Sequence, residues 1–314
     1  MRTLARLWER HQTWLAPLSS LLILMTAFAI IEPRFSDPDN LRTVALQTAT
    51  GGVLAIAQTL LIVCGAIDLS VGSVMALSAV MGGLTLKSGH PAFVAALACL
   101  ATGLACGFVN GWITVKLRVP AFITTLGMMG AARGLALQFS GASTVYWSQP
   151  ALSTLSDDTY LGLALPVWML IAVALIIGVG LAKTVPGRYA YAIGSNAEAV
   201  RLAGVRVSRY QIGYFMIAGL LVGLAGLMTM ARTGVAEPTA GEGDELKAVA
   251  ASVIGGASLM GGQGTVPGAL CGAFLMEALR NGCNLRDVSV EWQKVVIGAL
   301  IVAAVARDRF RRKE

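Results

Sequence analysis

The sequence is poor in charge, and this shortage decides the class of protein. Of its 314 residues only 13% are Asp, Glu, Lys or Arg, whereas a soluble domain carries about 25%. With 56% hydrophobic residues and a mean hydropathy of +0.71, too few polar side chains remain to cover a globular surface. The surplus apolar residues are therefore expected to face lipid, which excludes a soluble globular fold.

Residues for metal binding, disulfide formation and histidine-based catalysis are also scarce. The two histidines, His11 and His90, both lie beside predicted membrane boundaries. The five cysteines lie in or beside apolar runs without a Cys-x-x-Cys pair, a placement typical of small packing residues. The sequence also offers no credible nucleophile–base pair. We therefore expect no metal site, no cofactor and no catalytic centre.

The apolar residues are concentrated in long runs, and these predict the fold class. About 20 apolar residues cross the ~30 Å of bilayer hydrocarbon, and a segment at that depth forms a helix or part of a closed barrel. Barrel strands would alternate apolar and polar residues, whereas these runs are continuous. We expect an all-α polytopic membrane protein with about ten transmembrane helices in a single domain, 1–314. The predicted spans are 15–31, 43–64, 71–86, 92–115, 119–140, 161–182, 210–231, 247–262, 266–282 and 291–306.

Lys and Arg are distributed unevenly between the two sides of this arrangement. Segments on one side carry 15 of the 24 basic residues, and segments on the other carry 7 together with 11 of the 17 acids. Because basic residues concentrate in cytoplasmic loops, both termini are expected in the cytoplasm. The net charge of +7 then reflects orientation rather than nucleic-acid binding. Ala27-Phe28-Ala29 resembles a signal-peptide cleavage site, but the apolar run before Glu32 favours an uncleaved first span.

The longest predicted cytoplasmic segment, about 184–210, contains the pattern of a short helix. Ser195 with Glu198 three residues later fits a capping box, and Gly204 is placed to end the helix after two turns. Arg201 can pair with Glu198 across one turn. A helix this short needs a surface to dock on. It could lie on lipid headgroups or transmit force from a cytoplasmic partner, and the residues alone favour neither.

Two predicted spans adjoin unusual backbone. Between the second and third spans the chain turns through an acid, and Asp68 or Ser70 can cap the next helix. Broken helices also occur beside translocation paths, so Asp68, Ser70 and Gly72 are candidates for either role. The glycine-rich stretch 255–264 is poor helix interior, tolerated at membrane depth only when it is packed in protein or lines a cavity.

Charged residues within the spans are rare and are therefore functional candidates. Glu277 lies near the middle of 266–282, and Arg133 lies deep in 119–140. They could pair with each other, or they could line a polar channel with three amide side chains. The series of acids that would suit a proton relay is missing. The amide side chains are Gln58, Asn110 and Asn281.

Six motifs, in order between about 40 and 305, resemble those of the ribose/xylose/arabinose-type (simple sugar) ABC transporter permease family. Glu277 departs from that pattern, because its position is usually apolar in such permeases. The matching residues are 65–73 (GAIDLSVGS), 125–127 with 132–136 (TLG and ARGLA), 191–199 (YAIGSNAEA), 245–250 (ELKAVA), 254–262 (IGGASLMGG) and 281–285 (NGCNL).

The resemblance implies a non-catalytic, multi-pass permease subunit of an ABC importer that carries a simple sugar or related polyol across the bacterial inner membrane. Its partners would be a cytoplasmic ABC ATPase, a periplasmic sugar-binding protein and a second permease copy or paralogue, together with the lipid bilayer. The alternative is a proton-coupled secondary transporter that uses Glu277.

The same resemblance assigns expected roles to individual residues. The 184–210 segment would couple to the ATPase, which favours force transmission over lipid contact. Its coupling residues would be Ser195, Asn196, Glu198, Arg201 and Gly204. The candidates for the translocation path or its gate come from the residues themselves, as argued above, and are Gln58, Asp68, Ser70, Gly72, Asn110, Arg133, Glu277 and Asn281.

Overall fold

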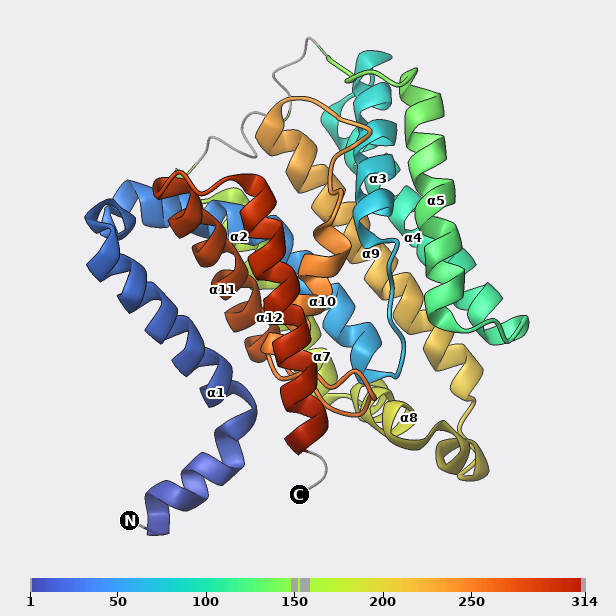
Figure 1. The fold of residues 1–314 in the computed structure, drawn as a ribbon. Coiled ribbons are helices and arrows are strands. Elements are labelled where there is room, and N and C mark those ends of the chain that lie inside the picture. The colour runs from blue at the N-terminus through green and yellow to red at the C-terminus, as the bar shows by residue number, and fades with distance from the viewer. Residues whose placement is uncertain (1, 148–151, 153–158, 312–314) are drawn as a thin grey trace.

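The computed structural model describes residues 2–147, 152 and 159–311, which form a bundle of helices (Figure 1). The predicted all-α class is confirmed, since strand within these ranges is confined to the antiparallel hairpin of β1 (Thr159–Tyr160) and β2 (Leu163–Ala164). The helices are α1 (Arg2–Ile31), the 3-10 helix η1 (Pro33–Ser36), α2 (Pro38–Val63), α3 (Val71–Lys87), α4 (Ala92–Lys116), α5 (Ala121–Ser140), α7 (Leu165–Lys183), α8 (Val185–Leu202), α9 (Val207–Thr233), α10 (Asp244–Ile254), α11 (Val266–Leu285) and α12 (Val290–Arg311).

Polar caps and glycines mark where several helices begin and end. Asp37 caps α2 by accepting a hydrogen bond from the backbone N–H of Asp39. Thr265 caps α11 in the same way, through the N–H of Gly268. At its far end α9 is closed by Gly234 with φ of 70°, a left-handed conformation that glycine adopts without strain.

Each predicted apolar span coincides with a helix over at least part of its length. Among the described residues α2, α4, α7 and α9 are long and apolar enough to cross a bilayer, and α3 and the apolar part of α1 (Leu15–Ile31) are shorter. The prediction of one helix over 247–262 is wrong. α10 has 11 residues, about 16 Å at 1.5 Å per residue. The chain leaves it because Gly256, Gly261 and Gly262 have positive φ angles of 90°, 84° and 74°.

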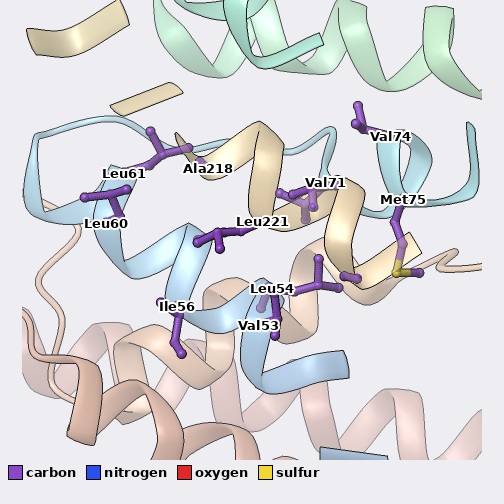
Figure 2. Packing of buried hydrophobic residues seen from close by; sticks show 14 of the residues in the cluster. Val53, Leu54, Ile56, Leu60, Leu61, Val71, Val74, Met75, Ala218 and Leu221 are labelled. Carbon is purple, nitrogen blue, oxygen red and sulfur yellow. The ribbon is translucent and has the colours of Figure 1, made fainter. Parts of the chain in front are cut away.

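The centre of the bundle is α2, whose second half is buried on every side. It contacts α7, α9, α10 and α11. Figure 2 shows Val53, Leu54 and Ile56 of α2 among side chains contributed by α3 and α9, such as Val71 and Leu221. A helix that is apolar all round is stable only where protein or lipid covers every face. Through Gln58, Gly51 and Asn40 this central helix reaches three further candidates, namely Asp68, Glu277 and Asn281.

Glycines allow α4 and α9 to pack at close range. A Cβ at Gly103 would lie 2.2 Å from the carbonyl oxygen of Gly219, and one at Gly107 would lie 3.0 Å from the Cα of the same residue. On α9 a Cβ at Gly223 would lie 2.5 Å from the carbonyl oxygen of Cys99. Small residues spaced by four are the usual means of close helix packing in membranes, where the hydrophobic effect does not drive helices together.

The outer helices present large apolar side chains at the surface. Soluble proteins rarely expose contiguous apolar patches, whereas lipid-facing helices require them. The exposure of these residues agrees with a membrane-embedded chain. They include Phe93, Leu97, Phe108 and Trp112 on α4, Phe122, Leu126 and Phe139 on α5, and Leu175, Ile176 and Val179 on α7.

Candidate functional site

A buried polar network lies where the chain leaves α2 and enters α3. The Oδ1 of Asp68 accepts hydrogen bonds from the backbone N–H of Ser70 (2.7 Å) and from its hydroxyl (2.6 Å). From α4, the Nδ2 of Asn110 donates to the Oγ of Ser70 (3.1 Å) and to the Oδ2 of Asp68 (3.5 Å). The Ser70 side chain makes no capping bond of its own. Of the two candidate caps, Asp68 therefore braces the start of α3 and ties it to α4.

Two further side chains extend this network to α2 and α5. In the amide orientation that satisfies both groups, Gln58 donates to the carbonyl of Asp68 (3.0 Å) and accepts from its N–H (3.3 Å). The Oγ1 of Thr125 accepts from the N–H of Leu69 (3.1 Å). Gln58, Asp68 and Asn110 are no more than 5% exposed. The structure thus brings four predicted path residues together with Thr125, as an interior cross-link between α2, α4 and α5.

The segment between α9 and α10, residues 234–243, packs back against the start of α3. A Cβ at Gly72 would lie 2.1 Å from the carbonyl oxygen of Gly241 and 2.6 Å from the Oε2 of Glu245. No real Cβ approaches backbone this closely, so only glycine fits at this position of α3. Gly72 therefore permits a helix–segment contact, and it carries no chemistry of its own.

Arg133 holds the same segment from α5. Its Nη1 donates to the carbonyl oxygens of Pro238 and Ala240. Glu277, by contrast, pairs with Arg280 one turn along its own helix, at 3.6 Å. The first of the two alternatives left open by the sequence, a pair between Arg133 and Glu277, is therefore not formed. The guanidinium group donates instead to backbone carbonyls of an irregular segment. The spacing of residues in the sequence does not indicate such a partner.

Glu277 lies on a cavity of about 370 Å³ between α2, α9, α10 and α11. It is 8% exposed, and its Oε2 makes no hydrogen bond within the described residues. A second ion pair on this cavity joins the Nζ of Lys247 to the Oδ1 of Asp244 at 2.8 Å. Arg232 also lines it. Sequence reasoning missed these three charged residues, because they fall between two predicted spans or, for Lys247, at the first residue of one, where charge is unremarkable.

Asn281 lies away from both the buried network and the cavity. Its amide and that of Asn40 exchange two hydrogen bonds, of 2.9 and 2.8 Å, which tie α11 to the start of α2. The predicted channel shared by Gln58, Asn110, Arg133, Glu277 and Asn281 is therefore not formed in this conformation. These residues belong to separate sets of contacts.

The 184–210 segment is more helical than expected. α8 begins directly after Thr184, whose Oγ1 accepts a hydrogen bond from the N–H of Gly187 (3.1 Å). It runs to Leu202 with a break at Asn196, where φ is −159° and ψ is 92°. The segment is thus two short helices in succession, and the prediction found only the second.

The second short helix has a different cap from the one expected. The Oδ1 of Asn196, not Ser195, accepts the capping hydrogen bond, from the N–H three residues on (3.0 Å), so the predicted capping box is wrong by one residue. The predicted Glu198–Arg201 ion pair is confirmed. The hydrogen bond from Arg201 lowers the pKa of the exposed Glu198 carboxyl. Gly204, with φ of 83°, ends the helix as predicted.

α8 docks on the end of α2 and on the glycine-rich segment that precedes α11. The Tyr191 hydroxyl donates to the carbonyl of Gly264 (2.8 Å), and the N–H of Gly262 donates to the carbonyl of Val63 (2.9 Å). A Cβ at Gly194 would lie 1.9 Å from the Val63 oxygen and 2.6 Å from the Gly262 nitrogen. Sequence reasoning missed this junction. The one feature of the sequence that indicated a close contact here was the glycine in the middle of the 191–199 motif.

Comparison with known proteins shows which family this chain belongs to. Residues 40–305 match the family model described as branched-chain amino acid transport system / permease component. The chain belongs to this permease family. The permease is 39% identical over 308 residues to the ribose import permease protein RbsC of Escherichia coli strain K12. The matched residues cover 95% of each chain. No solved structure gives a significant match.

Other relatives extend the similarity to further substrates. The permease is 37% identical to RbsC of Bacillus subtilis strain 168, covering 94% of this chain and 92% of that one. It is 34% identical to the fructose import permease protein FrcC of Rhizobium meliloti, covering 95% and 85%. The resemblance inferred from six motifs is therefore confirmed. Three of those motifs, 65–73, 191–199 and 254–262, supply the Asp68 network and the α8 junction.

Proposed function

We infer that this chain is the membrane-spanning permease subunit of an ABC importer that takes up a simple sugar or related polyol. The observation that carries this conclusion is similarity along nearly the whole chain to ribose and fructose import permeases. An L-arabinose ABC transporter permease protein of Azospirillum brasilense is also 32% identical, over 93% of this chain. The subunit is non-catalytic: a separate ABC ATPase hydrolyses ATP, and a substrate-binding protein delivers the sugar.

We propose that the chain is one domain with ten traverses of the bacterial inner membrane and both termini in the cytoplasm. The uneven distribution of Lys and Arg supports this orientation. In this topology α10 and the non-helical residues after it make one traverse together. Irregular backbone is tolerated at that depth because it is packed in protein, and Gly255 and Gly268 approach closely enough there to exclude a Cβ.

α8 is proposed as the element that couples to the ATPase. Its exposed second helix, with Asn196, Glu198 and Arg201, would receive the force, and Ser195 and Gly204 lie at its ends. The junction at Gly194 gives this force a route, because α8 touches both α2 and the segment that leads to α10 and α11. An element packed against two broken segments can bias both when it moves.

The gate is proposed to lie where the irregular segments meet the bundle. Gln58, Asp68, Ser70 and Asn110 fix the entry to α3, and Gly72 and Arg133 hold the segment before α10. Alternating access would require these contacts to exchange between two arrangements. The assembly is proposed as a dimer of this permease with a second copy or a paralogue, the form that the resemblance implies.

The proton-coupled alternative has no support. The relatives are named import permeases, and one is named as part of an ABC transporter. Glu277, the acid that this alternative requires, has an arginine as its ion-pair partner instead of a series of further acids. We therefore assign Glu277 a different role below.

Co-purification tests the proposed function. The tagged permease should isolate together with an ABC ATPase, and that complex should hydrolyse ATP faster when sugar-loaded binding protein is added. The permease alone should hydrolyse none. Hydrolysis by the isolated chain, or a permease that transports sugar without binding any ATPase, would contradict the assignment.

A further inference from the structure

The cavity between α2, α9, α10 and α11 contains a polar atom that the fold leaves without a donor. Glu277 is 8% exposed, and its Oε2 makes no hydrogen bond within the described residues. Arg280 is 3.6 Å from that oxygen, beyond the range of a good hydrogen bond. A buried acceptor without a donor costs free energy. This oxygen is therefore available to a donor that enters the cavity.

The lining of the cavity combines hydroxyl groups with apolar side chains. Thr50, Thr229 and Thr239 contribute hydroxyls, and Met75 and Met276 contribute apolar surface. A cyclic sugar has the same two characters, with hydroxyl groups around its edge and C–H groups on its faces. The volume of about 370 Å³ lies within the range of small-molecule pockets, about 300–1,000 Å³.

The charges around the cavity nearly cancel, which favours a neutral ligand. Two cations are already engaged by acids on the same helix, in the Lys247–Asp244 and Arg280–Glu277 pairs. The third cation, Arg232, is exposed, whereas a site for a phosphate or another anion would present several unpaired cations. The charged lining residues are Arg232, Lys247 and Arg280 against Glu237, Glu242, Asp244 and Glu277.

The cavity lies at the opposite end of α9 from α8. Its α9 residues are Thr229, Arg232 and Thr233, in the last turns of a helix of 27 residues that is about 40 Å long. α8 directly precedes the other end. In the proposed topology the cavity therefore belongs to the periplasmic half of the permease, where sugar is delivered.

We propose that this cavity is a sugar-binding site of the permease itself, in which the carboxylate of Glu277 accepts hydrogen bonds from the hydroxyls of a neutral sugar. This inference rests on the proposed function and adds a substrate contact within the membrane subunit. Hydrogen bonds to an ionised carboxylate are roughly twice as strong as neutral ones. This role gives a function to an acid that is otherwise buried on α11 without a hydrogen-bond donor for its Oε2 among the described residues.

A binding titration tests this site. The full chain is placed in lipid nanodiscs with its ATPase partner but without binding protein, and radiolabelled D-ribose, L-arabinose and D-fructose are titrated in turn. At least one sugar should bind saturably. Glu277→Gln, which keeps the size and removes the charge, should weaken that binding about tenfold. Thr50→Val, which removes one lining hydroxyl, should weaken it to a smaller extent. Glu291→Gln changes an exposed acid on α12 and should bind as the wild type does.

The outcomes separate this inference from the proposed function. Absence of binding for all three sugars, or unchanged affinity in both Glu277→Gln and Thr50→Val, would overturn the site. If ATP-driven uptake persists in the same wild-type preparation, the permease assignment stands without the site. Sugar binding without any ATP-driven uptake would instead contradict the proposed function. Thermal unfolding of each variant shows whether it is folded. If Glu277→Gln is unfolded, the affinity of Thr50→Val decides the test.

Discussion

At the scale of single residues, Asp68 is the candidate whose side chain and backbone both take part in buried hydrogen bonds. Its carboxylate accepts from Ser70 and Asn110, and its backbone faces the amide of Gln58. The donors that hydrogen-bond to it are buried, so water cannot replace the carboxylate as their acceptor if it is removed. The entry to α3 therefore depends on one acid, although the surrounding helices pack through apolar residues and glycine.

Replacement of Asp68 by alanine should destabilise the permease. The change leaves the N–H and the hydroxyl of Ser70 without their carboxylate acceptor, and each buried unpaired group costs about 1–3 kcal/mol. Thermal unfolding in detergent measures the loss. Asp39→Ala is the matched control, because the Asp39 side chain is 86% exposed and pairs with the exposed Arg42, an interaction that is worth ~0.2–1 kcal/mol. Equal unfolding temperatures for the two variants would contradict this role for Asp68.

Sequence reasoning at this scale succeeded where partners are local and failed where they are distant. The Glu198–Arg201 pair lies within one helical turn, so spacing predicts it. Ser195 and Asn196 are both good caps, and only the backbone break at Asn196 decides between them. The partners of Arg133 lie 105 and 107 residues away along the chain, on irregular backbone, and no local pattern indicates them.

At the scale of elements, glycine determines where α8 and α10 meet the rest of the bundle. α10 stops after 11 residues and is followed by residues that return to α8, where Gly194 sits against Val63 and Gly262. The apolar run predicted a longer helix because composition alone does not report a positive φ. The same glycines that end α10 allow the close approach through which α8 touches α2 and the segment before α11.

Gly194→Ala should break this junction. The added methyl would lie 1.9 Å from the Val63 carbonyl oxygen, so α8 must move away from α2, and overpacking of this kind costs about 1–3 kcal/mol. Because this cost falls on the docked arrangement of α8, we expect sugar uptake to fall about fivefold or more, at a factor of ten for each 1.4 kcal/mol, while the protein still reaches the membrane. Uptake in cells, normalised to the amount of permease in the membrane fraction, measures the effect.

Gly213→Ala is the matched control for this prediction. Gly213 is also a helical glycine, on α9, but a Cβ there meets nothing within 4 Å. Alanine favours a helix over glycine by about 1 kcal/mol, so this variant should transport normally and be at least as stable as the wild type. Normal uptake in Gly194→Ala would show that the α8 junction is not needed for coupling.

At the scale of the whole molecule, the bundle places α8 at one end of α9 and the Glu277 cavity at the other. The helices between them are joined by glycine contacts and by the Asp68 network, which are discrete contacts that two arrangements could exchange. The positions of the helices could be predicted because long apolar runs reflect the thickness of the membrane. The grouping of candidate residues could not, because it depends on which helices become neighbours.

Uptake into proteoliposomes tests the central claim most directly. The permease is reconstituted with its ABC ATPase and its binding protein, and labelled sugar is supplied with ATP held constant. We expect uptake that requires ATP and the ATPase and that continues when a protonophore collapses the proton gradient. Uptake that persists without the ATPase, or that stops when the gradient alone is removed, would contradict the account.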